Sequence, residues 1–299
     1  MKKYSRFVYT LFFVLFMISC TDSNKQESIN SDSVLIDDLG NKFELTEPPK
    51  RIITLAPNLT EMIYALNQED RLVGNTLYCN YPKEAEKITK VGDMLTMNYE
   101  VILSLKPDLV FITVEGNTKD NYDRLKEFGI SVFVSNPRNY NDIKQTFLQF
   151  GKIFDAYESA DSITKAWDKQ LTEIRSQIGN RKKSALFLAA ITPIMAAGRT
   201  TFINEFIEIC GLENIVKESK INYPVFSREE IIKVDPDYII YASKEELSKK
   251  YLTDIYAEWK NLSAVKNDKI IFVDPDLFYR PGPRFAEAVK TLYTKINKP

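Results

Sequence analysis

Two stretches of the sequence decide the fold: Asn98–Ile112, NYEVILSLKPDLVFI, and Ser227–Tyr241, SREEIIKVDPDYIIY. They align without gaps, the second beginning 129 residues after the first. Each opens with a helix-capping residue and a helical pattern, passes through a Pro-Asp turn, and ends in an apolar run typical of a buried strand. The repeat predicts two versions of one helix–strand unit in a single chain.

Both copies of the repeat place a glutamate two residues past the cap, Glu100 in the first and Glu229 in the second. An acid in the first turn of a helix stabilises the helix dipole, and this explains each glutamate taken alone. Their recurrence in both copies indicates a second role, in which two equivalent acids face a partner with two equivalent halves. The two roles are compatible.

Outward from the repeat, short β-branched runs alternate with helical patterns, as is typical of parallel α/β units. Asn58 stands three residues before Glu61 in the manner of a capping box, and Gly129 and Gly211 stand where helices are expected to end. The expected strands are 51–55, 108–113, 130–134, 184–190, 237–242 and 269–273, and the expected helices are 59–66, 119–128, 202–210 and 252–259.

Strand signals stop between Asp142 and Ile178, where apolar residues recur at spacings of three and four and predict a long helical stretch. The chain is therefore expected to run lobe, helix, lobe. We predict an N-terminal lobe at 34–155, a linking helix at 156–180 and a C-terminal lobe at 181–299.

The N-terminal residues are typical of an export signal. Basic residues precede an apolar run, Phe7–Ile18, that is too short to span a bilayer, so residues 1–19 are predicted to be a signal peptide. Ser19 before Cys20 resembles a bacterial lipobox, which predicts lipid attachment at Cys20; a plain signal peptide is the alternative. The polar residues 20–33 are expected to form a flexible tether. We thus expect an exported chain anchored on the periplasmic or cell-surface side of a bacterial membrane.

Composition excludes several function classes. The chain of 299 residues has a formal net charge of -1, so no basic excess favours a nucleic acid partner. It has no histidine, which removes the usual catalytic base and the commonest transition-metal ligand. We expect no metal site and no cofactor other than a bound ligand. Cys79 and Cys210 could form at most one disulfide and are predicted to be buried thiols instead.

An enzyme remains a remote alternative, because paired carboxylates can hydrolyse glycosides without histidine. Such a site needs two acids facing each other across a cleft, whereas Glu100 and Glu229 are expected on outward helix N-termini. Neither a phosphate-binding loop nor a dinucleotide fingerprint occurs in the sequence. We therefore expect a binding protein and no enzyme.

Several motifs, in order from about Lys50 to Ile296, resemble the class III substrate-binding proteins of ABC importers. The resemblance implies two Rossmann-like lobes joined by one long helix, with the ligand between them, in a monomer that touches the membrane only through its lipid anchor. It rests on the stretches RIITLAPNLTE at 51–61, YCNYP at 78–82, Val91-Gly92, Asn98-Tyr99-Glu100, LKPDLV at 105–110, CGLENI at 210–215, Ser227-Arg228-Glu229 and Pro283-Arg284.

The resemblance also implies roles for individual residues. Family members dock onto a dimeric permease through one glutamate per lobe that meets arginines, and the matching positions are Glu100 and Glu229. Family members of the cobalamin branch hold a corrin with aromatic side chains. The positions that match this ligand site are Asn58, Tyr78, Met94, Tyr223, Asp276, Leu277, Phe278, Tyr279 and Arg280.

This chain departs from the family pattern where Met94, Tyr223 and Leu277 replace tryptophans. A corrinoid is the first ligand expected, and a ferric siderophore or haem is the alternative in the same role. Haem is disfavoured because no histidine can be its axial ligand, although a tyrosine could. The cysteine with which the family pairs the equivalent of Cys210 is absent, which implies a free thiol there. A surface lipoprotein that scavenges ligand without a permease is a third possibility.

Arginines flank a rigid Pro-Gly-Pro turn near the C-terminus, Arg280 before it and Arg284 after it. The turn could aim a guanidinium into the cleft, where arginines of the siderophore branch hold anionic chelates. The alternative for Arg284 is that it caps a helix or pairs with an acid in its own lobe.

Overall fold

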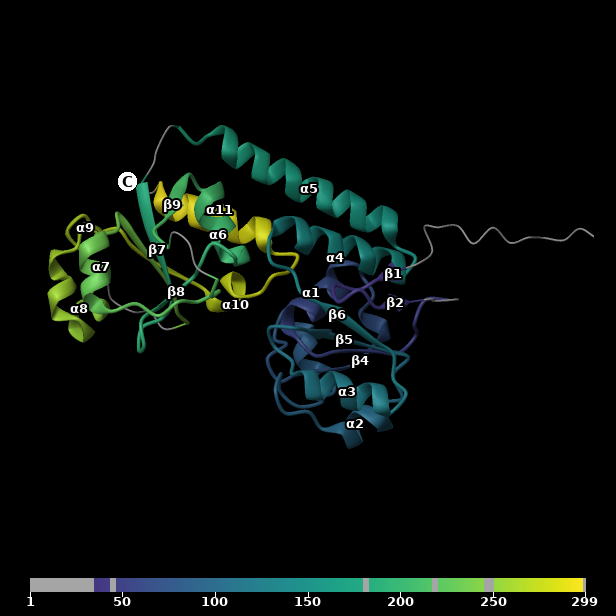
Figure 1. Ribbon diagram of the computed structural model, residues 1–299. Coiled ribbons are helices and arrows are strands. Elements are labelled where there is room, and N and C mark those ends of the chain that lie inside the picture. Colours follow the sequence, from purple (N-terminus) through teal and green to yellow (C-terminus); the bar gives the residue numbers. More distant parts are fainter. Residues whose placement is uncertain (1–34, 44–46, 180–182, 217–219, 245–249, 298–299) are drawn as a thin grey trace, which may run out of the picture. The chain divides into compact units, whose positions relative to one another are not determined.

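The computed structural model (Figure 1) describes residues 35–43, 47–179, 183–216, 220–244 and 250–297. Val34–Pro299 forms one compact unit. The predicted signal peptide, the tether and the lipid-attachment residue Cys20 lie outside the described residues.

A four-stranded parallel sheet occupies the first half of the compact unit, in the order β4-β3-β5-β6. Its strands are β3 (Ile52–Thr54), β4 (Leu72–Asn75), β5 (Leu109–Thr113) and β6 (Val132–Ser135). Four α-helices alternate with them, α1 (Pro57–Ala65), α2 (Tyr99–Ser104), α3 (Lys119–Glu127) and α4 (Tyr140–Ile153). A hairpin of β1 (Leu35–Ile36) and β2 (Lys42–Phe43) precedes the sheet, and 3₁₀ turns span Glu69–Arg71 and Lys83–Lys87.

A second sheet has the order β11-β10-β7-β8, and β9 also pairs with β7. Its strands are β7 (Lys183–Ala190), β8 (Met195–Ala196), β9 (Leu212–Asn214), β10 (Tyr238–Ala242) and β11 (Ile270–Val273), of which only β8 is antiparallel. The helices are α6 (Phe202–Ile209), α7 (Arg228–Val234), α8 (Tyr251–Ile255), α9 (Ser263–Lys266), α10 (Pro275–Phe278) and α11 (Phe285–Ile296), and a 3₁₀ turn spans Ala257–Asn261.

The sequence repeat corresponds to two equivalent structural units. Asn98 caps α2 by accepting a hydrogen bond from the backbone of Val101, and Ser227 caps α7 in the same way through Glu230. Each helix is followed by a central strand, β5 or β10, that is parallel to both of its neighbours. The predicted α/β alternation is confirmed, with strand ends shifted by one or two residues.

The mid-chain helical stretch consists of two helices, α4 and α5 (Tyr157–Ser176), separated at Asp155, whose backbone is left-handed with φ of 54°. Two local predictions are wrong. The helix expected at 252–259 is shorter and continues as a 3₁₀ turn. Asn58 is no cap: α1 begins at Pro57 after an uncapped Ala56, and Asn58 is buried inside the helix.

Helix α5 is the long helix that the resemblance implied, and it packs against α4 and α11 (Figure 1). Its buried apolar residues, among them Trp167, Leu171 and Ile174, belong to a core cluster that contains residues of both sheets. Phe111 and Phe150 in the first half and Phe187 and Phe206 in the second are fully buried members of that cluster. The two halves thus share one continuous core through α5.

Candidate functional site

The carboxyl ends of the strands define where side chains can meet. In each sheet the strand that follows β3 or β7 in the sequence pairs on one side of it, and a later strand pairs on its other side. Open α/β sheets bind ligands beyond the carboxyl ends of their strands at such a switch point. Asn58 lies just beyond β3, and the Nδ2 atom of its side chain donates to the carbonyl oxygen of Pro281 over 3.2 Å. Segments 223 residues apart in the sequence are thereby joined at this edge.

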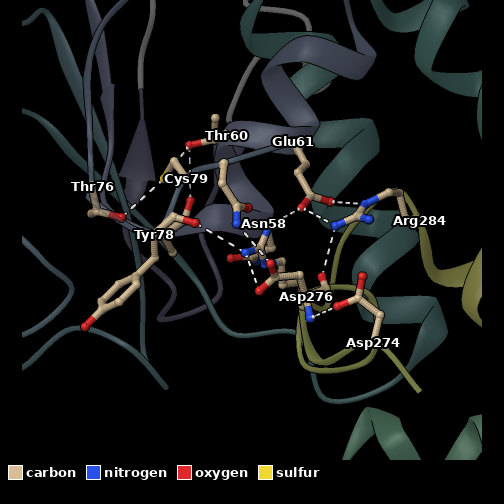
Figure 2. A network of polar contacts seen from close by, with 12 residues as sticks. Asn58, Thr60, Glu61, Thr76, Tyr78, Cys79, Asp274, Asp276 and Arg284 are labelled. Atoms are coloured by element: carbon tan, nitrogen blue, oxygen red, sulfur yellow. Dashed lines mark hydrogen bonds and ion pairs between the residues drawn. The ribbon is translucent and has the colours of Figure 1, made fainter. Parts of the chain in front are cut away.

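Glu61 is the centre of a buried ion cluster (Figure 2). Arg284 donates to both carboxylate oxygens, with Nε–Oε2 at 2.8 Å and Nη2–Oε1 at 2.7 Å, and Arg280 adds a third bond at 2.9 Å. The side chains are only 2%, 14% and 9% exposed for Glu61, Arg284 and Arg280. Both guanidiniums therefore neutralise an acid of helix α1, so the prediction that Arg284 pairs with an acid of its own lobe is wrong.

The sequence alone did not assign Glu61 this role, although its signal is readable. Glu61 lies in a helix whose other residues from Pro57 to Ile63 are buried. A carboxylate on such a helix needs a buried cation, since an unpaired buried charge is strongly unfavourable. The chain offers two arginines four residues apart around a rigid turn, and they supply that charge.

Asp276 forms a second, more accessible cluster beside the first. Its Oδ1 atom pairs with Arg280 at 2.8 Å, while its Oδ2 atom accepts from Asn80 at 2.9 Å and pairs with Lys244 at 2.6 Å. Burial alone would raise the pKa of Asp276, but the hydrogen bonds from Lys244 and Asn80 and the charge of Arg280 outweigh it and hold the pKa below its ordinary value. Asp276 is therefore a carboxylate at neutral pH, tied to both halves of the fold.

This lowered pKa gives a pH prediction. A carboxyl group whose pKa is lower in the folded state contributes stability that is present above its unfolded pKa and lost as the pH falls through the folded value. We expect Asp276→Asn to reduce stability at pH 7 and to have a clearly smaller effect at pH 3. Urea unfolding of both proteins at the two pH values measures this; an equal loss at pH 3 would contradict it.

The loop after β4 carries two exposed aromatic side chains next to these clusters. Tyr78 is 56% exposed, and Figure 2 shows its ring pointing away from the ion network. Its carbonyl oxygen accepts a 3.3 Å bond from Nη2 of Arg280. Arg284 lies over the ring of Tyr81, 3.9 Å from the ring centroid. Tyr78 is thus fixed by its backbone, while its ring is free to contact a ligand.

Met94, Tyr223 and Tyr279 are half-buried side chains packed against the main core cluster. Met94 rests on Gly116, where a Cβ atom would lie 1.8 Å from the methionine methyl carbon, so a larger residue at 116 would displace the end of this flexible side chain. The hydroxyl of Tyr279 donates to the carbonyl of Ala189 at 3.2 Å, at the end of β7. Burial raises the pKa of both tyrosines, so they stay neutral.

Two residues of the predicted ligand site lie in the core instead. Phe278 is fully buried and packs on Phe187 and Phe206, with ring centroids 6.3 and 5.1 Å away. Leu277 is buried in the same cluster. They occupy the short helix α10, and their side chains pack in the core of the second half of the fold. Because they are buried there, we do not count either residue among the ligand contacts.

A second bridge between the halves is polar. Arg138, which follows β6, pairs with Glu115, and Nδ2 of Asn222 donates to the same Oε1 atom over 3.3 Å. Beside it opens a cavity of about 660 Å³. Its lining residues are Arg138, Asn139, Arg199, Thr200, Thr201, Asn204, Glu205, Glu208 and Asn222. No predicted ligand residue lines this cavity, and Asn222 is the neighbour of one, Tyr223.

Glu100 and Glu229 are both exposed on the first turns of α2 and α7. Within the described part of the chain neither carboxylate has an ion-pair partner. The two glutamates occupy equivalent positions in the repeat, so each half of the fold presents an exposed carboxylate at its surface.

Cys79 and Cys210 are buried free thiols, and burial raises the pKa of Cys210 to about 12. Among the described residues, no cluster of acids and cysteines could hold a metal ion. None of the helices within the described ranges is long and apolar enough to cross a membrane.

Comparisons with known proteins bear on the family and the fold of this chain. Residues 52–277 match a family model described as periplasmic binding protein. An uncharacterized ABC transporter substrate-binding lipoprotein of Bacillus subtilis, YvrC, is 31% identical, and the match covers 92% of this chain and 89% of that protein.

Two solved structures are similar in fold and sequence. The vitamin B12-binding protein BtuF of Vibrio cholerae superposes with a TM-score of 0.73 at 27% identity, covering 83% of this chain and 97% of that one. A possible iron-binding, periplasmic solute-binding protein of Staphylococcus epidermidis gives a TM-score of 0.74 at 28% identity, covering 84% and 100%.

Proposed function

This chain belongs to the periplasmic binding protein family, and on that premise we propose that it captures cobalamin or a related corrinoid and delivers it to the permease of an ABC importer. The observation that carries the proposal is the junction at the strand ends, where exposed Tyr78 is bonded through its backbone to Arg280 from the other half of the fold. A flat ligand placed there would meet an aromatic ring and polar groups from both halves.

The proposed contacts are the predicted residues other than Leu277 and Phe278, which pack in the apolar core cluster. The aromatic and apolar contacts are Tyr78, Met94, Tyr223 and Tyr279, with a polarisable sulfur at Met94. Asn58, Asp276 and Arg280 supply the polar ones. Capture and delivery need no catalytic step, and the two central carboxylates, Glu61 and Asp276, are paired with arginine and lysine side chains.

A ferric siderophore is the second candidate ligand, and the cations at the junction favour it. Lys244, Arg280 and Arg284 are the side chains that could hold an anionic chelate. All three are already paired with Asp276 or Glu61, so little positive charge remains for an anion. This pairing is why we place a corrinoid first.

Titration calorimetry on the full-length protein, with cyanocobalamin, cobinamide and a panel of ferric siderophores, tests the ligand. We expect corrinoid binding, weakened about tenfold or more by Tyr78→Ala, since aromatic contacts dominate such interfaces. Tyr157→Ala, which removes another exposed tyrosine on α5, is the matched control and should bind normally. Siderophore binding without corrinoid binding would contradict the corrinoid proposal and support a ferric siderophore as the ligand.

For delivery we propose that Glu100 and Glu229 dock onto a dimeric permease, one acid meeting each half. The support is their equivalent placement in the repeat and their exposure. We further propose an exported monomer, cleaved after residue 19, lipid-anchored at Cys20 and tethered by residues 20–33. Its N-terminal lobe would be 34–155, its linking helix 156–180 and its C-terminal lobe 181–299.

A further inference from the structure

The loop that carries Tyr78 has two distinct sides. Residues 76–85 leave the end of β4 and return to it at Lys90, which bridges to Asn75. Thr76, Cys79 and Ala85 are buried, whereas Tyr78 and its neighbours Leu77 and Tyr81 are exposed. The loop has no strand partner along most of its length, so other groups must satisfy its inward carbonyls.

Lys90 fills the inside of this loop with its ammonium group. The Nζ atom donates to Oδ1 of Asn75 at 2.7 Å, to the carbonyl of Ala85 at 3.0 Å and to the carbonyl of Cys79 at 3.4 Å. An ammonium has three hydrogens, and these acceptors use all of them. Burial lowers the pKa of Lys90, while nearby Cys79 and Glu86 oppose that shift. Burying the ammonium charge of Lys90 is unfavourable, and its hydrogen bonds to the three acceptors offset that cost.

Cys79 connects the same loop to helix α1. Its thiol sulfur lies 3.1 Å from the hydroxyl of Thr60 and 3.2 Å from that of Thr76, both buried (Figure 2). Cys79 immediately follows Tyr78, so the hydrogen bond from Lys90 to the Cys79 carbonyl holds the backbone one residue away from the exposed ring. Any loosening at Lys90 would move the Tyr78 ring and expose the Cys79 thiol together.

We propose that Lys90 is a positioning residue for ligand binding: it holds the loop 76–85 closed so that Tyr78 presents its ring at the junction of the two halves. Its effect on the ligand rests on the proposed function, which assigns Tyr78 a contact. Its effect on the loop does not. Two measurements separate these two parts.

The first measurement needs no ligand. Full-length protein is treated with a maleimide, and modification of Cys79 and Cys210 is followed by peptide mass spectrometry. We expect Lys90→Met to speed labelling of Cys79 about tenfold or more, because losing charged hydrogen bonds raises the population of the open loop by such factors. Cys210 should label at its usual rate, and Lys90→Arg should restore most of the protection.

Lys87→Met is the matched control, since Lys87 is an exposed lysine of the same segment and should leave both thiols protected. Unchanged labelling of Cys79 in Lys90→Met overturns the proposal. Equal acceleration at Cys79 and Cys210 also overturns it, because it would show a global loss of stability. If Lys90→Met does not fold, Lys90→Gln gives the same comparison with one donor group retained.

The second measurement is a double-mutant cycle on cyanocobalamin affinity. We expect Lys90→Met to weaken binding about tenfold in the wild-type background. In the Tyr78→Ala background it should have little further effect, because both changes remove the same contact, that of the Tyr78 ring with the ligand. Additive losses would show that Lys90 does not act through Tyr78. If the wild-type protein binds no corrinoid, the proposed function fails, and the labelling experiment still decides the role of Lys90 in the loop.

Discussion

Replacing Glu61 with glutamine is expected to lower the free energy of unfolding by about 3–5 kcal/mol, because removing one partner from a buried ion cluster leaves charge uncompensated. Glutamine keeps the shape of the side chain and can still accept at one oxygen. It cannot neutralise Arg280 and Arg284, which together donate three hydrogen bonds to the carboxylate. Urea unfolding at pH 7 measures the loss.

Glu47→Gln is the matched control, because Glu47 forms an exposed ion pair with Lys50, and such pairs contribute at most about 1 kcal/mol. A cycle with Arg284→Met sharpens the test. The double variant should lose less than the two single losses added together, since each single change already breaks the same cluster. A loss below about 1 kcal/mol for Glu61→Gln would mean that the cluster is hydrated and contributes little.

Reversing both exposed glutamates, Glu100→Lys with Glu229→Lys, is expected to reduce uptake about 100-fold or more while ligand affinity stays within twofold. Close charge pairs at protein interfaces couple by about 1.5 kcal/mol or more each, and like charges placed there repel. Each single reversal should have a smaller effect, because one half of the interface remains. Uptake of labelled corrinoid in cells and calorimetry on the same variants measure the two quantities.

Glu158→Lys is the control for this experiment, since Glu158 is an exposed acid in the first turn of α5 and has no counterpart in the repeat. It should leave uptake unchanged. If uptake also survives the double reversal, the docking proposal fails, and a lipoprotein that scavenges ligand without a permease becomes the better account. Neither outcome bears on which ligand is bound.

Much of the fold was readable from the sequence, because the signals are local. The repeat, its caps at Asn98 and Ser227 and the buried runs after each Pro-Asp turn predicted the α/β units, and the predicted fold of class III binding proteins is confirmed. Strand β4 was missed because it is four residues long and contains Gly74.

The site was less readable, because its chemistry depends on pairs far apart in the chain. Glu61 was taken as part of a capping box, although its partners are 219 and 223 residues away. Lys90 carries no sequence signal, since its acceptors are backbone carbonyls and one asparagine. Phe278 and Leu277 looked like ligand contacts because the sequence does not tell which face of a four-residue helix is turned inward.

The Glu61 cluster also constrains the order in which an exported chain can mature. A polypeptide that crosses a membrane N-terminus first presents helix α1 long before Arg280 and Arg284 emerge. Until the last segment arrives, α1 cannot bury its carboxylate without the large cost of an unpaired charge. At this helix the first half therefore gains the charged partners of its carboxylate only when the arginines of the far end arrive. In such a protein the N-terminal half completes its buried ion cluster only after the C-terminal segment has arrived.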